Sequence, residues 1–184
     1  MATVNLHPSS TVSNEWVISG GDGTVHGVLS DDVDSSVIKN PHQNQTAIVQ
    51  LDDFSIPYDS ITSIRFYVRG VLFNARSGDT DIQVKLENSS GTSLYAETVT
   101  LNFTAAYAPE DHYGTLRTTS DGSAAWTGSD LNGLRRNINT SPEDPPVLSF
   151  AQVTKVYVEV TYVPFHISKI KGSLTLKGGS MIIK

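Results

Sequence analysis

Side chains that could carry out chemistry are limited in type in this chain of 184 residues, because the sequence contains no cysteine. Disulfides, thiolate metal sites and cysteine nucleophiles are therefore excluded. The histidines are scattered, with no two at the i, i+2 or i, i+4 spacing of a shared metal site; they are His7, His26, His42, His112 and His166. We therefore expect no metal centre built on histidine.

The densest group of carboxylates is the segment from Ser30 to Ser36, in which Asp31, Asp32 and Asp34 offer oxygen ligands to a cation. The segment lacks the central glycine and the bidentate glutamate of an EF-hand loop. Turns in which Asp and Ser side chains bond to the backbone explain the same residues more simply. Our prediction is that the protein holds no metal and no cofactor.

Sequence motifs for catalysis are missing from the chain. There is no G-x-S-x-G, P-loop or G-x-G-x-x-G pattern, and no pair among the nineteen acidic residues stands out as a glycosidase acid and base. The glycine-rich segment Gly20–Thr24 lies between candidate strands, and without a following helix it is no phosphate-binding loop. We therefore predict no catalytic residue and no enzymatic activity.

Tyrosines offer a different chemistry, the stacking of sugar rings. Tyr67 and Tyr157 are predicted at outward strand positions, while strand or loop position makes Tyr107 and Tyr113 further candidates. Outward tyrosines also pack across strands or contact other subunits, so a carbohydrate platform is one of several alternatives. The two tryptophans are expected to fill the core instead.

The elements that must position these side chains are predicted to be β-strands. Alternation of apolar and polar residues, typical of half-buried antiparallel strands, runs through Ile64–Leu72, Asp81–Glu87 and Lys155–Tyr162. Weaker strand candidates are Glu15–Ser19, Val25–Leu29, Thr46–Leu51, Leu94–Phe103 and Val147–Phe150. Turn-forming clusters separate these segments, so we predict an all-β fold, an antiparallel jelly-roll-like β-sandwich.

One short helix is also predicted, over residues 130–138. Its apolar residues share one helical face, and Arg135 and Arg136 suit the negative end of the helix dipole. We divide the chain into an N-terminal arm (residues 1–14), the β-sandwich domain (15–163) and a C-terminal strand-forming arm (164–184).

Charge is unevenly distributed along the chain. The net charge of −6 argues against a nucleic-acid-binding surface, and no apolar run approaches the ~18 residues of a membrane span. All nineteen acidic residues lie before residue 166, whereas the residues after it include four lysines and no acid. We therefore expect partners that are neither nucleic acid nor membrane.

The basic C-terminal arm repeats a seven-residue pattern, K-G-S-L-T-L-K followed by G-G-S-M-I-I-K, which predicts two very short strands joined at Gly178–Gly179. An isolated hairpin of this kind is marginally stable in water at best. The arm either covers an edge of its own domain's sheet, pairs with other copies of the chain, or is disordered. In the second alternative its interaction residues are Ile167, Ile170, Leu174, Leu176, Met181, Ile182 and Ile183.

Four stretches, Ser10–Gly20, His26–Ile38, Trp126–Ile138 and Val153–Tyr162, together resemble virion structural proteins of tailed bacteriophages and related prophages. The resemblance covers roughly residues 9–163. It implies a jelly-roll or sandwich domain built into a capsid or tail surface, and it carries over no functional residues.

The function that this resemblance implies is that of a capsid decoration (cement) protein. Such a protein would lie on the outer surface of the virion as a homotrimer and bridge subunits of the major capsid protein, or bind another virion protein. Two alternatives stay open: a head-fibre or tail-associated structural protein, and a carbohydrate-binding module for host attachment. The last predicts loss of glycan binding when Tyr67 or Tyr157 is changed to alanine.

Overall fold

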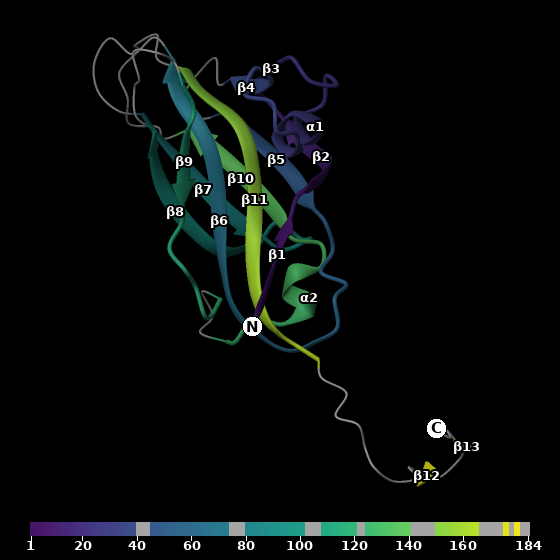
Figure 1. The fold of residues 1–184 in the computed structure, drawn as a ribbon. Helices are drawn as coiled ribbons and strands as arrows, with labels where there is room; N and C mark the ends of the chain where they lie inside the picture. The colour runs from purple at the N-terminus through teal and green to yellow at the C-terminus, as the bar shows by residue number, and fades with distance from the viewer. Residues whose placement is uncertain are drawn as a thin grey trace.

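The computed structural model describes residues 1–39, 45–73, 80–101, 108–120, 124–140, 150–165, 175–176 and 179–180. Over these residues most of the chain lies in two antiparallel β-sheets, called sheet A and sheet B below, that pack face to face (Figure 1). The predicted all-β, jelly-roll-like β-sandwich is confirmed.

Sheet A has six strands and is centred on the long pair of β6 and β11. Its strands are β1 (Ala2–Leu6), β3 (Val17–Ser19), β4 (Val37–Lys39), β6 (Tyr58–Phe73), β9 (Glu110–Tyr113) and β11 (Phe150–Pro164). The order across the sheet is β3-β4-β11-β6-β9, and β1 also pairs with β11. This sheet faces the viewer in Figure 1.

Sheet B has five strands, in the order β2-β5-β10-β7-β8. They are β2 (Pro8–Asn14), β5 (Thr46–Leu51), β7 (Thr80–Glu87), β8 (Ser93–Leu101) and β10 (Arg135–Thr140). The N-terminal residues therefore contribute one strand to each sheet, and the chain crosses between the sheets at His7.

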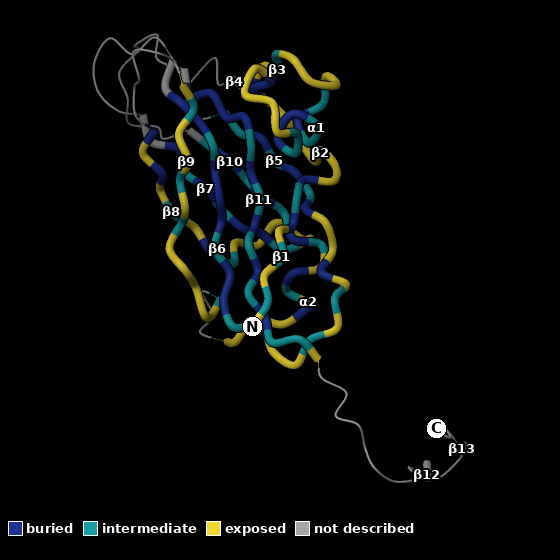
Figure 2. Tube along the Cα trace, in the orientation of Figure 1, coloured by how far each residue is buried: buried dark blue, intermediate teal, exposed yellow. Residues whose placement is uncertain are grey.

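The hydrophobic core lies between the sheets (Figure 2). Along β11, Val156, Val158 and Val160 are fully buried, and the residues between them point outward. Full burial of such a side chain contributes about 1.5–3 kcal/mol to folding. As expected, Trp16 and Trp126 belong to this core, since each is only 3% exposed.

The prediction of a strand over Val25–Leu29 is wrong, because these residues belong to helix α1 (Val25–Ser30). The Thr24 side chain caps this helix by accepting a hydrogen bond from the backbone N–H of Gly27 at 3.1 Å. The glycine-rich segment Gly20–Thr24 is thus followed by a helix, contrary to expectation, although one of only six residues.

The predicted helix over residues 130–138 is also wrong in extent. Helix α2 (Gly128–Leu131) is only four residues long, with a capping box between Thr127 and Asp130. Just after the helix, Gly133 adopts a φ of 74°, which favours glycine. In the part of the chain that the structure describes, neither helix is long and apolar enough to cross a membrane.

The residues that follow α2 continue into β10, so their apolar pattern has period 2 rather than 3.6. Leu134, Arg136 and Ile138 face the core, and each is fully buried. The prediction that Arg135 and Arg136 lie at a helix end is therefore wrong as well. The spacing of residues 131, 134 and 138 fits one face of a helix, which led to the wrong prediction. The alternation of buried residues in the strand was not recognised because one of its inward residues, Arg136, is charged.

The C-terminal repeat contains two short strands, as predicted, but Gly179 lies in the second strand and not in the connection between them. β12 (Thr175–Leu176) and β13 (Gly179–Ser180) pair antiparallel in a sheet of their own. Leu176 lies in β12, whereas the other predicted interaction residues lie outside the described residues: Ile167, Ile170, Leu174, Met181, Ile182 and Ile183.

Candidate functional site on the outer face of sheet A

Three tyrosines come together on the outer face of sheet A because of strand register. Tyr67 of β6 pairs with Tyr157 of β11 on one side and with Tyr113 of β9 on the other. Alternation along each strand directs the three side chains away from the core. The result is a line of rings across three adjacent strands, which we call the tyrosine row.

The rings of the tyrosine row are in contact. Tyr67 and Tyr157 are stacked, with centroids 4.3 Å apart and an interplanar angle of 14°. Tyr113 meets Tyr67 edge-on, with centroids 5.1 Å apart. Tyr67 is only 6% exposed, whereas Tyr113 is 53% exposed, so Tyr113 offers the most accessible ring.

Further side chains flank the tyrosine row. The His7 ring lies 5.6 Å from that of Tyr157. On one side of the row, Arg65 Nε donates to Glu159 Oε1 at 2.6 Å. The same guanidinium lies 4.7 Å from the centroid of the Tyr113 ring, close enough for a cation–π interaction. Arg65 therefore helps to fix the orientation of the exposed ring.

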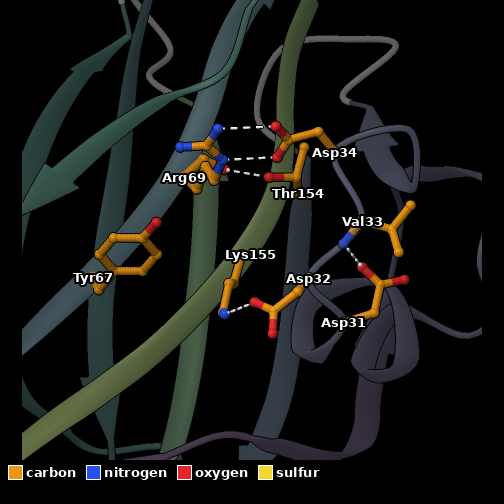
Figure 3. Close-up of a pocket in the computed structure, with 8 residues that line it drawn as sticks. All are labelled: Asp31, Asp32, Val33, Asp34, Tyr67, Arg69, Thr154 and Lys155. Carbon is orange, nitrogen blue, oxygen red and sulfur yellow. Dashed lines mark hydrogen bonds and ion pairs between the residues drawn. The ribbon is translucent and has the colours of Figure 1, made fainter.

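A polar pocket of about 280 Å³ opens beside the row, on the side away from Arg65. The segment between α1 and β4 forms one wall, and β6 and β11 form the floor (Figure 3). The lining residues are Asp31, Asp32, Val33, Asp34, Tyr67, Arg69, Thr154 and Lys155.

Ion pairs hold this polar pocket together. Arg69 donates from Nε and Nη2 to the two carboxylate oxygens of Asp34, at 2.7 and 2.8 Å. Its Nη1 donates to Asp111 at 2.5 Å, and the Tyr67 hydroxyl donates to the same oxygen at 2.6 Å. Bidentate Arg–carboxylate pairs fix geometry as well as charge. Arg69 thus joins the tyrosine row to the pocket wall.

On the other side of the pocket, Lys155 pairs with Asp32. Asp31 accepts a hydrogen bond from the backbone N–H of Val33 at 3.0 Å, which shapes the turn. The three aspartates therefore serve the turn and two ion pairs. Among the described residues no group of three His, Cys, Asp or Glu side chains is placed to hold a metal ion.

The ionisation of these groups follows from their contacts. The hydrogen bond from Arg69 lowers the pKa of Asp34, and that from Tyr67 lowers the pKa of Asp111. Lys155 likewise lowers the pKa of Asp32. Burial raises the pKa of Tyr67, and burial together with Tyr113 raises the pKa of Tyr157 to about 12. The site therefore combines neutral phenols with ionised carboxylates, which accept hydrogen bonds. A glycosidase general acid needs a carboxyl group with a raised pKa, whereas the pKa shifts of Asp32, Asp34 and Asp111 are downward.

Arg136 lies beneath the tyrosine row, inside the core. It is fully buried, and its Nη1 donates to the backbone carbonyl of Tyr157 at 2.7 Å. Its guanidinium lies 5.0 Å from the centroid of the Phe66 ring, while Nε and Nη2 have no hydrogen-bond partner. Burial lowers the pKa of Arg136 to about 9. Arg136 thus links sheet B to the backbone of the row.

The structure brings together three of the four tyrosines considered as a sugar platform. Tyr107 lies outside the described residues. The sequence placed Tyr67 and Tyr157 correctly, but it carried no signal that Asp34, Asp111 and Arg69 would meet.

Comparison with known proteins identifies no family for this chain. No family model matches the chain, and no curated protein matches it. Among solved structures, one described as "CBM4 structure and function" is 11% identical, with a TM-score of 0.46, and the match covers 79% of this chain and 94% of that chain.

Two further solved structures are similar at the same level. A carbohydrate-binding module, CsCBM6-3 from Clostridium stercorarium in complex with cellobiose, is 15% identical; the match covers 88% of this chain and 94% of that chain, with a TM-score of 0.39. The catalytic domain of a GH87 alpha-1,3-glucanase is 12% identical; the match covers 96% of this chain but 30% of that chain, with a TM-score of 0.44. Likenesses this distant assign no function.

Proposed function

We propose that this protein binds carbohydrate on the outer face of sheet A. The observation that carries the proposal is the contact between the tyrosine row and the polar pocket, joined by Arg69 and Asp111. The support comes from this geometry and not from the distant structural likenesses.

A sugar ring has the chemistry that this face matches. Its C–H groups form an apolar face that stacks on an aromatic ring, and its hydroxyls lie around the rim as donors and acceptors. Tyr113 offers a half-exposed ring for stacking. Beside the row, the carboxylates of Asp32 and Asp34 offer acceptors to hydroxyls. A few placed polar groups next to apolar surface are typical of small-molecule sites.

The proposed function is binding without bond cleavage. The carboxylates of the pocket whose pKa is shifted are held ionised by Arg69 and Lys155, so they accept protons poorly and have none to donate. Tyr67 is too buried to stack on a ligand, and its role is to hold Tyr113 and Tyr157 in line.

The test is a glycan array followed by calorimetry with the variant Tyr113→Ala. We expect binding to weaken about 2- to 12-fold, because an aromatic stacking contact contributes about 0.5–1.5 kcal/mol. Phe165→Ala is the matched control, since Phe165 is also an exposed aromatic residue, 56% exposed, at the end of β11 and outside the row. Equal loss of binding in both variants contradicts the proposal.

The expected place on the outer surface of a virion, the homotrimer and the contact with the major capsid protein stay predictions. A glycan-binding face is compatible with a virion protein that attaches to a host, which is the carbohydrate-binding alternative above. If the tyrosine row is instead a contact between subunits, Tyr113→Ala changes the sedimentation coefficient, and neither the wild-type protein nor the variant binds a glycan.

A further inference from the structure

We infer that the polar pocket selects neutral glycans and excludes acidic ones, such as those built from uronic acids. This inference rests on the proposed function and names the ligand class for the same site. It comes from the charge inventory of the pocket and from the way in which its two cations are occupied.

Carboxylates outnumber cations in the pocket lining. Asp31, Asp32 and Asp34 face Arg69 and Lys155, and Asp111 adds a fourth carboxylate where it meets Arg69. The pocket is therefore net negative, and it belongs to a chain whose overall net charge is −6. A ligand carboxylate entering the pocket meets repulsion at short range.

Both cations of the pocket are already paired with aspartates. Three nitrogen atoms of Arg69 already donate to Asp34 and Asp111, and Lys155 is paired with Asp32. A glycan carboxylate can reach only the remaining N–H groups of these two cations, whose positive charges are already balanced by aspartates. Its attraction to either cation is therefore offset by repulsion from the aspartates beside it.

Neutral hydroxyls meet no such obstacle. An ionised carboxylate has about four acceptor positions, and the ion pairs occupy only some of them. Hydroxyl groups can donate to the rest without breaking the Arg69 or Lys155 contacts. The arrangement that repels an acidic sugar therefore accepts its neutral counterpart.

The experiment compares matched pairs of ligands by calorimetry at low salt. Cello-oligosaccharides are paired with their C6-oxidised glucuronate forms, and β-1,4-manno-oligosaccharides with mannuronan oligosaccharides. Within each pair only the group at C6 differs. We expect the wild-type protein to bind the neutral member of at least one pair and to bind its acidic partner at least about fivefold more weakly.

The variant Asp32→Asn sharpens the test, because Asp32 is exposed and its loss frees Lys155. We expect it to strengthen binding of the acidic member about fivefold, an increase that disappears at high salt. Asp59→Asn is the matched control, since it removes one exposed negative charge near the start of β6 and away from the pocket.

The outcomes separate the two proposals. Equal binding of neutral and acidic members, or the same behaviour of Asp32→Asn and Asp59→Asn, overturns the neutral selectivity and leaves carbohydrate binding standing. Absence of binding to every glycan on the array and in both pairs overturns both.

Discussion

The two outer faces of the sandwich share the same alternation but present different side chains. On sheet A, adjacent strands place Tyr67, Tyr157 and Tyr113 in ring contact. On sheet B, the central strand β10 presents Asn137 and Asn139 at the equivalent outward positions. Alternation decides which positions face outward, whereas the residues at those positions decide what a face can bind.

The faces also differ in how their polar side chains are linked to one another. On sheet A, Tyr67, Arg69 and Asp111 bond to one another. On sheet B, Asn137 donates to Glu87 at 2.8 Å, but among the described residues the Oδ1 atoms of Asn137 and Asn139 have no partner. Groups that already hold one another lose less entropy when a ligand binds. This difference is why we assign binding to sheet A.

The largest effect that sharpens the comparison is expected beneath the tyrosine row, at Arg136. Arg136→Ala removes a large core side chain and should lower the free energy of unfolding by about 2–5 kcal/mol, as other large-to-small core changes do. Arg136→Met keeps most of the volume and removes a buried charge without a carboxylate partner, so we expect little loss or a gain. Urea unfolding measures both.

The control for this pair is Arg135→Met, on the neighbouring outward position of β10. We expect it to change stability by no more than about 0.5 kcal/mol. If Arg136→Met is as destabilising as Arg136→Ala, the hydrogen bond to the Tyr157 carbonyl, and not side-chain volume, is what holds the two sheets together at this point.

Much of the fold could be predicted from local pattern, because alternation is a property of neighbouring residues. It placed β7 and the central parts of β6 and β11, and with them the outward positions of Tyr67 and Tyr157. It failed where two periods fit the same residues. The pattern predicts a strand for Val25, Val28 and Leu29, which lie in α1, and a helix for Leu134 and Ile138, which lie just before and within β10.

The site itself could be predicted only in part. Asp34 and Arg69 are 35 residues apart in sequence and Tyr67 and Asp111 are 44 apart, so their contacts depend on how the chain is folded. The sequence suggested turn residues around Asp31 and tyrosines on strands. It gave no reason to expect that the turn would lie over the strands that carry the row.

A smaller effect is expected from single hydrogen-bonding groups on the two faces. Tyr67→Phe removes the hydroxyl that donates to Asp111 and should lower the free energy of unfolding by about 0.5–1.5 kcal/mol. Asn139→Ala removes an amide oxygen that has no partner and should change it by less than about 0.5 kcal/mol. Equal losses in urea unfolding contradict the difference between the faces.

The smallest effect is the response of stability to alkaline pH. Tyrosine in an unfolded chain has a pKa of about 10, and the folded protein raises the pKa of Tyr157 to about 12. A raised folded pKa means that the folded state keeps a proton that the unfolded state releases. This stabilisation is complete below pH 10 and is lost as the pH rises to about 12.

The measurement is made in the Arg136→Met variant. In the wild-type protein the lowered pKa of Arg136 raises the free energy of unfolding with pH, opposite to the effect of Tyr157, because above about pH 9 the folded state loses a proton that the unfolded state keeps. In that background we expect the free energy of unfolding to fall between about pH 10 and pH 12. Adding Tyr157→Phe should make the fall shallower, since phenylalanine has no proton to lose. An unchanged slope means that Tyr157 titrates as it does in the unfolded chain. In that case the tyrosine row does not shield the Tyr157 hydroxyl from water, and the difference between the two faces rests on the Tyr67, Arg69 and Asp111 contacts and the exposed Tyr113 ring.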